Sequence, residues 1–483
     1  MELILIPIIA GFTAAFAGKW GRWVALLGSV TALAITFGFL NKFQMGNGEF
    51  QMIWDRIWFS SAIHFKTGID GITMIMLLLT NVLGVLILAS AINKTNRNPV
   101  LFALIVGMQG ALNGVFLAMD GIMFYIFWEL ALIPIYFICA MWGEGNRFAT
   151  TLKFFIYTFI GSLAMLASLI YLYNKMPAGG TFDYKALLAV NLTETEAIWV
   201  GAGILLAFAV KIPLLPLHSW QPDTYTEAPT AGSMLLSAIM LKMGLYGLIR
   251  WFFPIVPEAV LFYIPLIIGA GIIGVLYGAI IAIRQTDMKR LVAFSSLSHV
   301  GLIAAGIATL TMEGMQGAIL QMFSHGINIF GLFFAIDIIQ RRAGTRELGS
   351  IGGIAKQAPR FAALFLIVVL GATAVPFTNG FPGELLLLKS VFNYHTVWGI
   401  CAGLTIIFCA VYMLRMYQMS MLGKEKGDVY LFPDLALREL GLMGITVAMV
   451  IGIGIYPQWI LDICGPSVHK TILTIQDTVG VLK

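Results

Sequence analysis

The sequence predicts an all-α polytopic membrane protein, and three observations support this fold class. Of the 483 residues, 59% are hydrophobic and only 11% are charged, whereas about a quarter of a soluble domain is charged. The apolar residues gather in stretches close to the ~20 residues that span a bilayer as a helix. The connections between them are too short for a soluble domain, so residues 1–483 are predicted to be one membrane domain in lipid.

Fourteen apolar stretches are predicted to be transmembrane helices, numbered here in chain order. They lie at about 2–17, 20–41, 70–92, 100–119, 121–142, 152–173, 197–217, 231–253, 259–283, 290–310, 316–338, 361–391, 396–420 and 440–461. The first stretch lacks the basic residues that precede the apolar part of a cleaved signal, so it is predicted to be a span. The longest connections contain Gly, Asn or charged residues and are predicted to face solvent, at 42–69, 174–196 and 421–439.

The basic residues of the connections predict the orientation. Connections after odd-numbered helices carry 18 of the 29 Lys and Arg residues, whereas the other connections and the two tails carry nine. Basic residues favour the cytoplasmic side, so both termini are expected outside, in a bacterial inner membrane. No basic run suggests nucleic-acid binding. The two remaining cations, Lys211 and Lys242, fall within apolar helices.

Two of the predicted helices are broken, and each carries a charge at its break. In AFAVKIPLLPLHSW, Pro213 and Pro216 interrupt helix 7 just beyond Lys211. In TAVPFTNGFPGELLLL, Glu384 follows the prolines and glycines that interrupt helix 12. Paired broken helices with charges are typical of transporters built from repeats. Irregular backbone at membrane depth must be buried in protein or line a wet cavity, so both breaks predict polar interiors.

The spacing of the polar residues supports such a repeat. Glu129 and Lys211 are 82 positions apart, and His299 and Glu384 are 85 apart. Each interval runs from the second to the fourth helix of a five-helix unit, if the units are helices 4–8 (100–253) and 9–13 (259–420). Because each unit has an odd number of helices, successive units begin on opposite sides of the membrane, so the two units would be inverted with respect to each other. Residues 1–99 then form three N-terminal helices, and 421–483 form a C-terminal helix and tail.

Charged residues inside apolar helices are costly and mark an ion or proton pathway by default. Lys211 and Lys242 are accompanied by Glu129, mid-helix in GIMFYIFWELALIPIYF, and by Glu384. The alternative for each is a structural ion pair between helices. Because there are four such residues and two lie at helix breaks, a pathway is the favoured interpretation.

Two histidines lie between these charges in the sequence. His299 has Ser295 four residues before it, and His325 has Gln321 four residues before and Asn328 three residues after it, so each lies on a polar helix face. A lone buried histidine is more often a satisfied hydrogen-bonding residue than a proton carrier. Histidine can change charge near neutral pH, and here the pair fills the interval between Lys242 and Glu384, which favours a proton relay.

Several chemistries leave no trace in the sequence. It contains no phosphate-binding or dinucleotide-binding glycine motif, no haem or iron–sulfur spacing, and no Ser/His/Asp arrangement in a soluble domain. Its four cysteines show no ligand spacing and are predicted to be core residues: Cys139, Cys401, Cys409 and Cys464. A gradient or a redox partner must therefore supply the energy, and no cofactor is expected in this chain.

The polar motifs resemble one known family over nearly the whole chain. WELALIPIYF, KIPLLPLHSWQPDTYTEAPTAGSMLL, LKMGLYGLIR, SLSHVGLIAAG and FSHGINIFGLFF resemble, in order, blocks of the antiporter-like membrane subunits of respiratory complex I and of multisubunit cation/proton antiporters. The resemblance implies that Glu129 and Lys211 form the family's buried pair. It also implies that Lys242 connects the two halves and that His299 and His325 form the central relay.

Glu384 narrows the resemblance to the M branch of complex I (chain 4 in mitochondria), because the other branches usually carry lysine there. The chain also lacks the long lateral helix of the L branch. The resemblance implies a proton-translocating subunit of an NADH:quinone oxidoreductase, with L-like and N-like subunits as neighbours and an iron–sulfur and flavin arm as an indirect partner. Quinone reduction elsewhere would weaken the support that Glu129 gives Lys211 and drive a proton through the relay to Glu384.

Two other functions remain open from the sequence. One is a subunit of a Na+/H+ antiporter, which lysine at position 384 would have favoured. The other is a non-conducting structural subunit, in which the buried charges only hold helices together.

Overall fold

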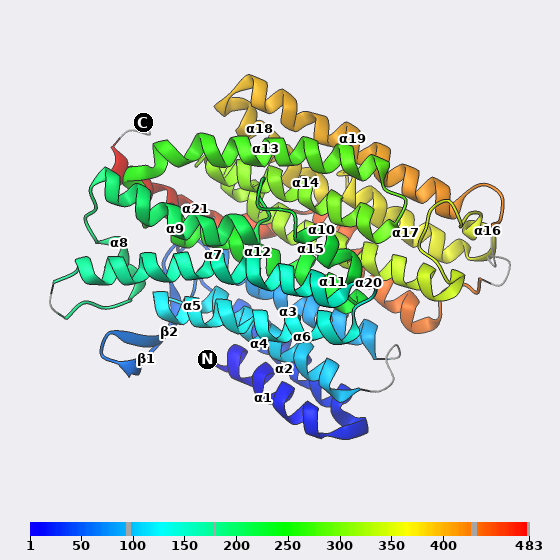
Figure 1. Cartoon of the computed structure of the whole chain (residues 1–483), viewed down its shortest axis with the longest axis horizontal. Helices are drawn as coiled ribbons and strands as arrows, with labels where there is room; N and C mark the ends of the chain where they lie inside the picture. Colours follow the sequence, from blue (N-terminus) through cyan, green and yellow to red (C-terminus); the bar gives the residue numbers. More distant parts are fainter. Residues whose placement is uncertain (93–97, 178, 427–431, 481–483) are drawn as a thin grey trace.

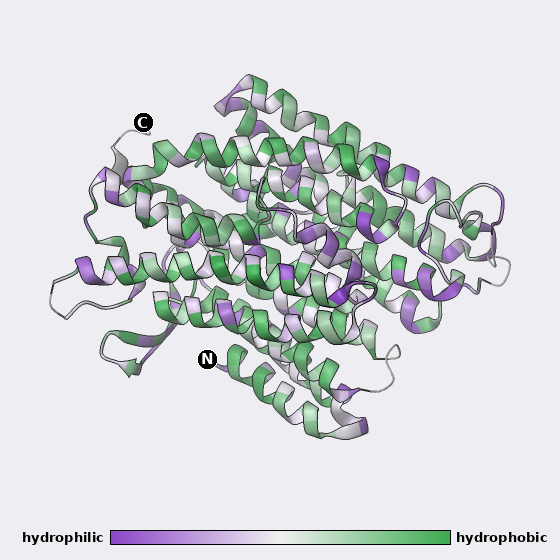
Figure 2. Ribbon diagram, viewed as in Figure 1, coloured by the Kyte–Doolittle hydropathy of each residue, from purple (hydrophilic) through white to green (hydrophobic). Residues whose placement is uncertain are grey.

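The computed structural model describes residues 1–92, 98–177, 179–426 and 432–480, and most of them are helical (Figure 1). The helices lie side by side along the long axis, and hydrophobic residues dominate them between two ends where hydrophilic connections gather (Figure 2). Among the described residues, eleven helices are long and apolar enough to cross a membrane. The prediction of a mostly helical protein with many membrane spans is therefore confirmed.

Helices occur in all fourteen predicted stretches. The first half of the chain forms α1 (Glu2–Phe16), η1 (Gly18–Trp20), α2 (Gly21–Lys42), β1 (Gln51–Ser60), β2 (Ile63–Ile69), α3 (Gly71–Ala91), α4 (Pro99–Leu117), α5 (Gly121–Leu130), α6 (Leu132–Trp142), α7 (Arg147–Lys175), α8 (Tyr184–Leu188), α9 (Glu194–Lys211), α10 (Gln221–Glu227), α11 (Thr230–Met234), the π-helical η2 (Leu235–Met240), α12 (Leu241–Gly247) and the π-helical η3 (Leu248–Phe252). The second half forms η4 (Pro257–Ala259), α13 (Val260–Arg284), α14 (Met288–Ala308), α15 (Met312–Ala343), α16 (Ile354–Gln357), α17 (Pro359–Ala372), α18 (Gly380–Tyr394), α19 (Thr396–Met421), α20 (Leu437–Ile455) and α21 (Gln458–Val479).

The chain leaves helical geometry at both predicted breaks. α9 ends at Lys211, and the next helix begins only at Gln221. α17 ends at Ala372, and α18 begins at Gly380. The prolines in these segments cannot donate a backbone hydrogen bond, which is why the helices end there.

The connections sort into two sets, one at each end of the bundle. At the end that carries both termini (the termini end, left in Figure 1), the amide of Phe182 donates to the carbonyl of Ala62 at 2.9 Å. At the opposite end, Arg346 bonds Glu144 at 2.8 Å and Asp287 at 2.5 Å. The first contact joins two even-numbered connections and the others join odd-numbered ones, as expected when helices alternate in direction.

Three helical segments form the centre of the bundle. Every residue is buried (100%) in the apolar 18-residue stretches of Thr230–Phe252, α14 and α15. In the equivalent stretches of α7 and α19, only 39% and 33% of the residues are buried. The outer helices therefore shield the central segments from lipid. Polar side chains on the central segments can consequently contact only protein or enclosed water.

Aspartate side chains fix the starts of several helices. The carboxylates of Asp70, Asp120 and Asp287 accept backbone N–H bonds from the first turns of α3, α5 and α14, at 2.9–3.0 Å. Free N–H groups in the first helical turn lack intrahelical partners, so these carboxylates satisfy them.

Two elements were not predicted from the sequence. The connection 42–69 contains an antiparallel hairpin, β1–β2, at the termini end. The C-terminal tail is also helical, since α20 ends at Ile455 and the separate helix α21 begins at Gln458. The tail that was expected after helix 14 therefore contains a further helix. α21 carries polar residues along its length, which hides it from a search for apolar stretches.

Two residues counted as loop cations are in fact buried. Arg250 is 5% exposed and pairs with Asp70, and Lys289 is 1% exposed and donates to the carbonyl of Ala228. The pattern of apolar residues shows where a helix ends. It does not show whether a Lys or Arg side chain near that end points into solvent or into the protein. Three other residues in the basic-residue count lie outside the described residues: Lys94, Arg97 and Lys483.

Glycine allows α13 and α14 to pack closely. A Cβ placed on Gly271 would lie 2.6 Å from the carbonyl oxygen of Gly301, and a Cβ on Gly301 would lie 2.5 Å from that of Gly271. A side chain at either position would force the helices apart. On the same helix, a Cβ on Gly269 would meet nothing within 4 Å.

We expect Gly271→Ala to destabilise the protein by about 1–3 kcal/mol, the usual cost of overpacking. The matched substitution Gly269→Ala should leave stability unchanged or slightly higher. The midpoint of thermal inactivation in detergent compares the two variants. Equal midpoints would show that the close crossing of α13 and α14 does not contribute to stability.

Candidate functional site

Five of the six predicted site residues lie deep inside the bundle. Each is at most 4% exposed, and they come from α9, α12, α14, α15 and α18: Lys211, Lys242, His299, His325 and Glu384. The sixth, Glu129, is half-buried. The site is therefore an internal row of polar side chains with a carboxylate at one edge.

Lys211 occupies the last position of α9, at the first helix break. Its Nζ lies 5.3 Å from the centroid of the Trp128 ring and 5.7 Å from that of Phe154, where cation–π attraction favours the ammonium. Nζ has no hydrogen-bond partner among the described residues. The break itself is fixed by Trp220, whose Nε1 donates to the carbonyl of Val210 at 2.9 Å.

Glu129 and Lys211, which the resemblance implied to be a buried pair, interact through their charges rather than through a direct bond. No contact within 4.0 Å joins the two side chains among the described ion pairs, although their charges are close enough to interact. Glu129 also lies in the last turn of α5, and α6 begins two residues after that helix ends, at Leu132. Because Ala131 between them keeps right-handed helical geometry, Gly121–Trp142 forms one 22-residue helical span with Glu129 inside it, as predicted.

Lys242 and His325 are in direct contact at the centre of the bundle. Lys242 Nζ lies 2.8 Å from His325 Nδ1 and donates to the carbonyl oxygen of Ser237 at 2.7 Å. Ser237 belongs to the π-helical η2, immediately before α12. Both side chains are enclosed, and this contact joins the first half of the chain to the second.

The row continues from His325 to His299 and then to Cys409. The two imidazole ring centroids are 6.0 Å apart. His299 Nε2 lies 3.4 Å from Cys409 Sγ, and that thiol donates to the carbonyl oxygen of Ala372 at 3.3 Å. Ala372 is the last residue of α17, so the thiol connects a histidine to the second helix break. We call Lys242, His325, His299 and Cys409 the central track.

Glu384 lies on α18 just beyond the second break, 2% exposed, and its Oε1 has no hydrogen-bond partner among the described residues. Its charge interacts with the side chains of Cys409 and Tyr412 on α19. The Tyr412 hydroxyl is 3.1 Å from Ser295 Oγ on α14. Glu384 is therefore a neighbour of the central track without a direct bond to it.

A small cavity lies beside the two histidines. It leaves about 10 Å³ for the centre of a water molecule and is lined by residues that include Ser295, His299, Gln321, His325 and Asn328. This is close to the space that one water needs. All five of these polar residues were predicted to share polar helix faces, and the structure brings them together.

Two residues that contact this polar cluster were not predicted to be site residues. Cys409 was predicted to be an ordinary core residue, and Tyr412 was not singled out. Both lie on α19, three positions apart and therefore on one helix face. Thiol and phenol groups are common in apolar helices, so only their contacts with His299 and Ser295 identify them.

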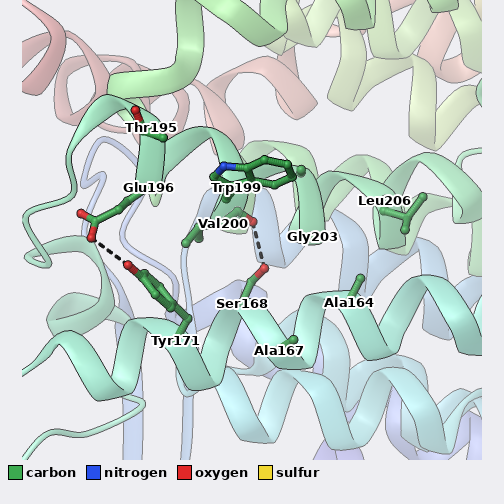
Figure 3. A pocket seen from close by; sticks show the side chains of 11 residues that line it. Ala164, Ala167, Ser168, Tyr171, Thr195, Glu196, Trp199, Val200, Gly203 and Leu206 are labelled. Atoms are coloured by element: carbon green, nitrogen blue, oxygen red, sulfur yellow. Dashed lines mark hydrogen bonds between the residues drawn. The ribbon is translucent and has the colours of Figure 1, made fainter.

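A separate surface groove of about 590 Å³ lies between α7 and α9 (Figure 3). In it, Tyr171 points to Glu196 with a hydrogen bond of 2.7 Å, and Ser168 donates to the carbonyl of Val200 at 3.0 Å. The remaining lining side chains that Figure 3 labels are mostly apolar or small. The groove contains none of the predicted site residues.

Comparison with known proteins identifies the family of this chain. Residues 118–409 match the family model described as NADH:quinone oxidoreductase/Mrp antiporter, TM. NADH-quinone oxidoreductase subunit M of Escherichia coli K12 is 35% identical, covering 98% of this chain and 97% of that protein. The protein of the same name from Rhodobacter capsulatus is 32% identical, covering 99% and 95%.

Solved structures agree with this match. A chain of respiratory complex I from Thermus thermophilus superposes with a TM-score of 0.91 at 29% identity, covering 98% of this chain and all (100%) of that one. A chain of the Mrp complex from Dietzia shares the fold, with a TM-score of 0.88 at 20% identity and coverage of 99% and 98%. The chain therefore belongs to the NADH:quinone oxidoreductase/Mrp antiporter family of membrane proteins.

Proposed function

We propose that this chain is the M-type, proton-translocating membrane subunit of an NADH:quinone oxidoreductase. The observation that carries the proposal is the central track, in which a buried lysine, two histidines and a thiol succeed one another between the two halves of the bundle. Relatives that align over nearly the whole chain bear the name of that subunit.

In this proposal the six predicted residues carry protons in the order Glu129, Lys211, Lys242, His325, His299 and Glu384. Lys211 holds a proton at the first break, stabilised by the nearby rings and by the charge of Glu129. His325 exchanges a proton with Lys242 across 2.8 Å. Lys211, Lys242 and the two histidines are enclosed, so a positive charge on one disfavours a positive charge on the next, and a proton that arrives at one of them promotes release from its neighbour.

The finer architecture is part of the same proposal. Fourteen segments span the membrane, with helices 4–8 and 9–13 as inverted repeats. The domain boundaries follow these units, at 1–99, 100–253, 259–420 and 421–483. Both termini face the outside of a bacterial inner membrane. The grouping of odd-numbered connections at one end, with bonds from Arg346 to Glu144 and Asp287, supports this orientation.

The partners follow from the same proposal. L-like and N-like membrane subunits would adjoin this chain, and an iron–sulfur and flavin arm would supply the energy from quinone reduction. This chain would need no cofactor of its own.

A Na+/H+ antiporter subunit is the second candidate function, since the Mrp complex shares the fold. Glu384 disfavours it, because the resemblance places lysine at this position in antiporter subunits. The structural-subunit alternative predicts paired charges. Lys211 Nζ and Glu384 Oε1 have no hydrogen-bond partner among the described residues, which favours a role in conduction.

Lys211→Met should abolish most proton pumping in the assembled complex and lower coupled NADH:quinone turnover at least about tenfold, because it removes the proton site while keeping an apolar stem of similar length. Pumping and turnover are measured in proteoliposomes, and assembly by native electrophoresis. Adding Glu129→Gln relieves any orphaned charge. Recovery of pumping in this double variant would contradict the relay.

Glu384→Gln should slow pumping while leaving assembly intact, because an amide keeps the shape of the carboxyl group but cannot ionise. Glu313→Gln is the matched control, since that carboxylate is exposed and bonds Lys389 at the surface. Protons translocated per electron are the measurement. An unchanged ratio in Glu384→Gln would exclude Glu384 from the pathway.

Cys409→Ala should reduce pumping several-fold, because it removes the partner of His299 and leaves the carbonyl of Ala372 unbonded, at a cost of about 1–3 kcal/mol. Cys409→Ser should retain more activity, since a hydroxyl can make both bonds. Cys401→Ala, on the same helix, is the control. Equal pumping in Cys409→Ala and Cys401→Ala would remove the thiol from the track.

A further inference from the structure

We propose that Arg250 is an electrostatic seal, which stops protons of the relay from escaping through the termini end of the first half. This inference rests on the proposed proton relay and adds a barrier function to a cluster outside it. The cluster consists of Arg250, Asp70 and the side chains around the guanidinium.

A pocket lies at the termini end, and Arg250 on its wall stands eight positions after Lys242 in the sequence. The pocket has a volume of about 180 Å³, and its lining includes Phe50, Tyr184, Arg250, Ser467 and Lys470. One wall belongs to α21, which is fixed to the start of α3 because the amide of Gly71 donates to Ser467 Oγ at 2.9 Å. We call this space the end pocket.

Arg250 forms part of the wall of the end pocket and is 5% exposed. Its guanidinium pairs with Asp70 and lies 4.7 Å from the ring centroid of Phe50, with Tyr184 and Tyr246 each at 5.9 Å. Its Nε has no hydrogen-bond partner among the described residues. Aromatic rings and a single carboxylate therefore hold a permanent positive charge beside the pocket.

A polar helix face connects this charge to the relay. Lys242, Tyr246 and Arg250 are four positions apart in sequence, in α12 and η3, and residues at this spacing in a helix share a face. The Tyr246 hydroxyl bonds the carbonyl of Phe116 at 2.9 Å and lies 3.2 Å from Thr73 Oγ1. Tyr246 is the one polar side chain between Lys242 and Arg250 in this described segment, and its ring centroid lies 5.9 Å from the guanidinium.

Without a barrier, protons would leave the relay along this helix face. A proton on Lys242 could pass along Tyr246 to water in the end pocket, and the energy stored in the relay would be lost. The guanidinium cannot lose its proton under physiological conditions. A fixed positive charge in a narrow polar passage repels protons, as arginine does in water-selective pores. Asp70 holds the side chain in place and compensates the cost of burying it.

The ordinary alternative is an ion pair that only joins α3 to η3. The two interpretations predict different behaviour once both charges are removed together. If the pair is only structural, neutralising both residues leaves no orphaned charge, and an assembled complex should remain tight. If Arg250 is a seal, the same variant should conduct protons passively.

The experiment compares the whole complex in proteoliposomes carrying Asp70→Asn with Arg250→Gln, or carrying Arg250→Lys alone. An imposed pH gradient is followed by an internal dye, without NADH, and valinomycin with potassium holds the membrane potential at zero. The neutral pair should speed the decay at least about tenfold, the factor expected when an electrostatic barrier is removed. Arg250→Lys keeps the charge and should stay as tight as the parent.

Two further variants complete the test. Asp70→Ser with Arg250→Ser offers a smaller neutral polar pair and should also leak. Glu49→Gln with Lys470→Gln removes an exposed ion pair at the same pocket and should not leak. A gradient that decays as slowly in either assembled neutral pair as in the parent would overturn the seal. Because no turnover is needed, loss of pumping in the relay variants would not affect this result.

Discussion

The contact between Lys242 and His325 is the interaction on which the rest of the structure depends. A lysine at the centre of a membrane protein is costly, and among the described residues this one bonds an imidazole nitrogen and a backbone carbonyl rather than a carboxylate. It is tolerated because the central segments are completely enclosed by protein. The outer helices therefore do more than support a fold, since they exclude lipid from a site that changes its protonation state in the proposed relay.

The two helix breaks and the close helix crossings follow from this requirement. A continuous apolar helix offers few polar groups at membrane depth, whereas a break exposes carbonyl oxygens such as that of Ala372 to a thiol. Glycine pairs such as Gly271 and Gly301 bring α13 and α14 together without side chains between them. The polar row is thus kept narrow, and large hydrated spaces do not form beside the histidines.

Much of this could be predicted from the sequence, for definite physical reasons. Apolar length reveals membrane helices, proline reveals breaks, and a charge inside an apolar stretch reveals a site because it is so costly. The same reasoning failed where the signal is shared by ordinary residues. Cys409 is indistinguishable from a core cysteine, Arg250 from a loop cation, and the polar helix α21 from a tail. The distance between Glu129 and Lys211 depends on how α5 and α9 pack, which spacing along the chain does not determine.

The π-helical turns beside Lys242 have a mechanical consequence. A π turn contains one residue more than an α turn, and the segments Leu235–Met240 and Leu248–Phe252 stand on either side of the lysine. If the extra residue moved from one side of α12 to the other, the short helix between them would rotate by about 100°, the angle per residue of an α-helix. Lys242 would then swing away from His325 while both ends of the segment stayed in place. Moving one residue of π-helical geometry across α12 would therefore separate Lys242 from His325, and with them the two halves of the proposed relay, without moving any helix through the membrane.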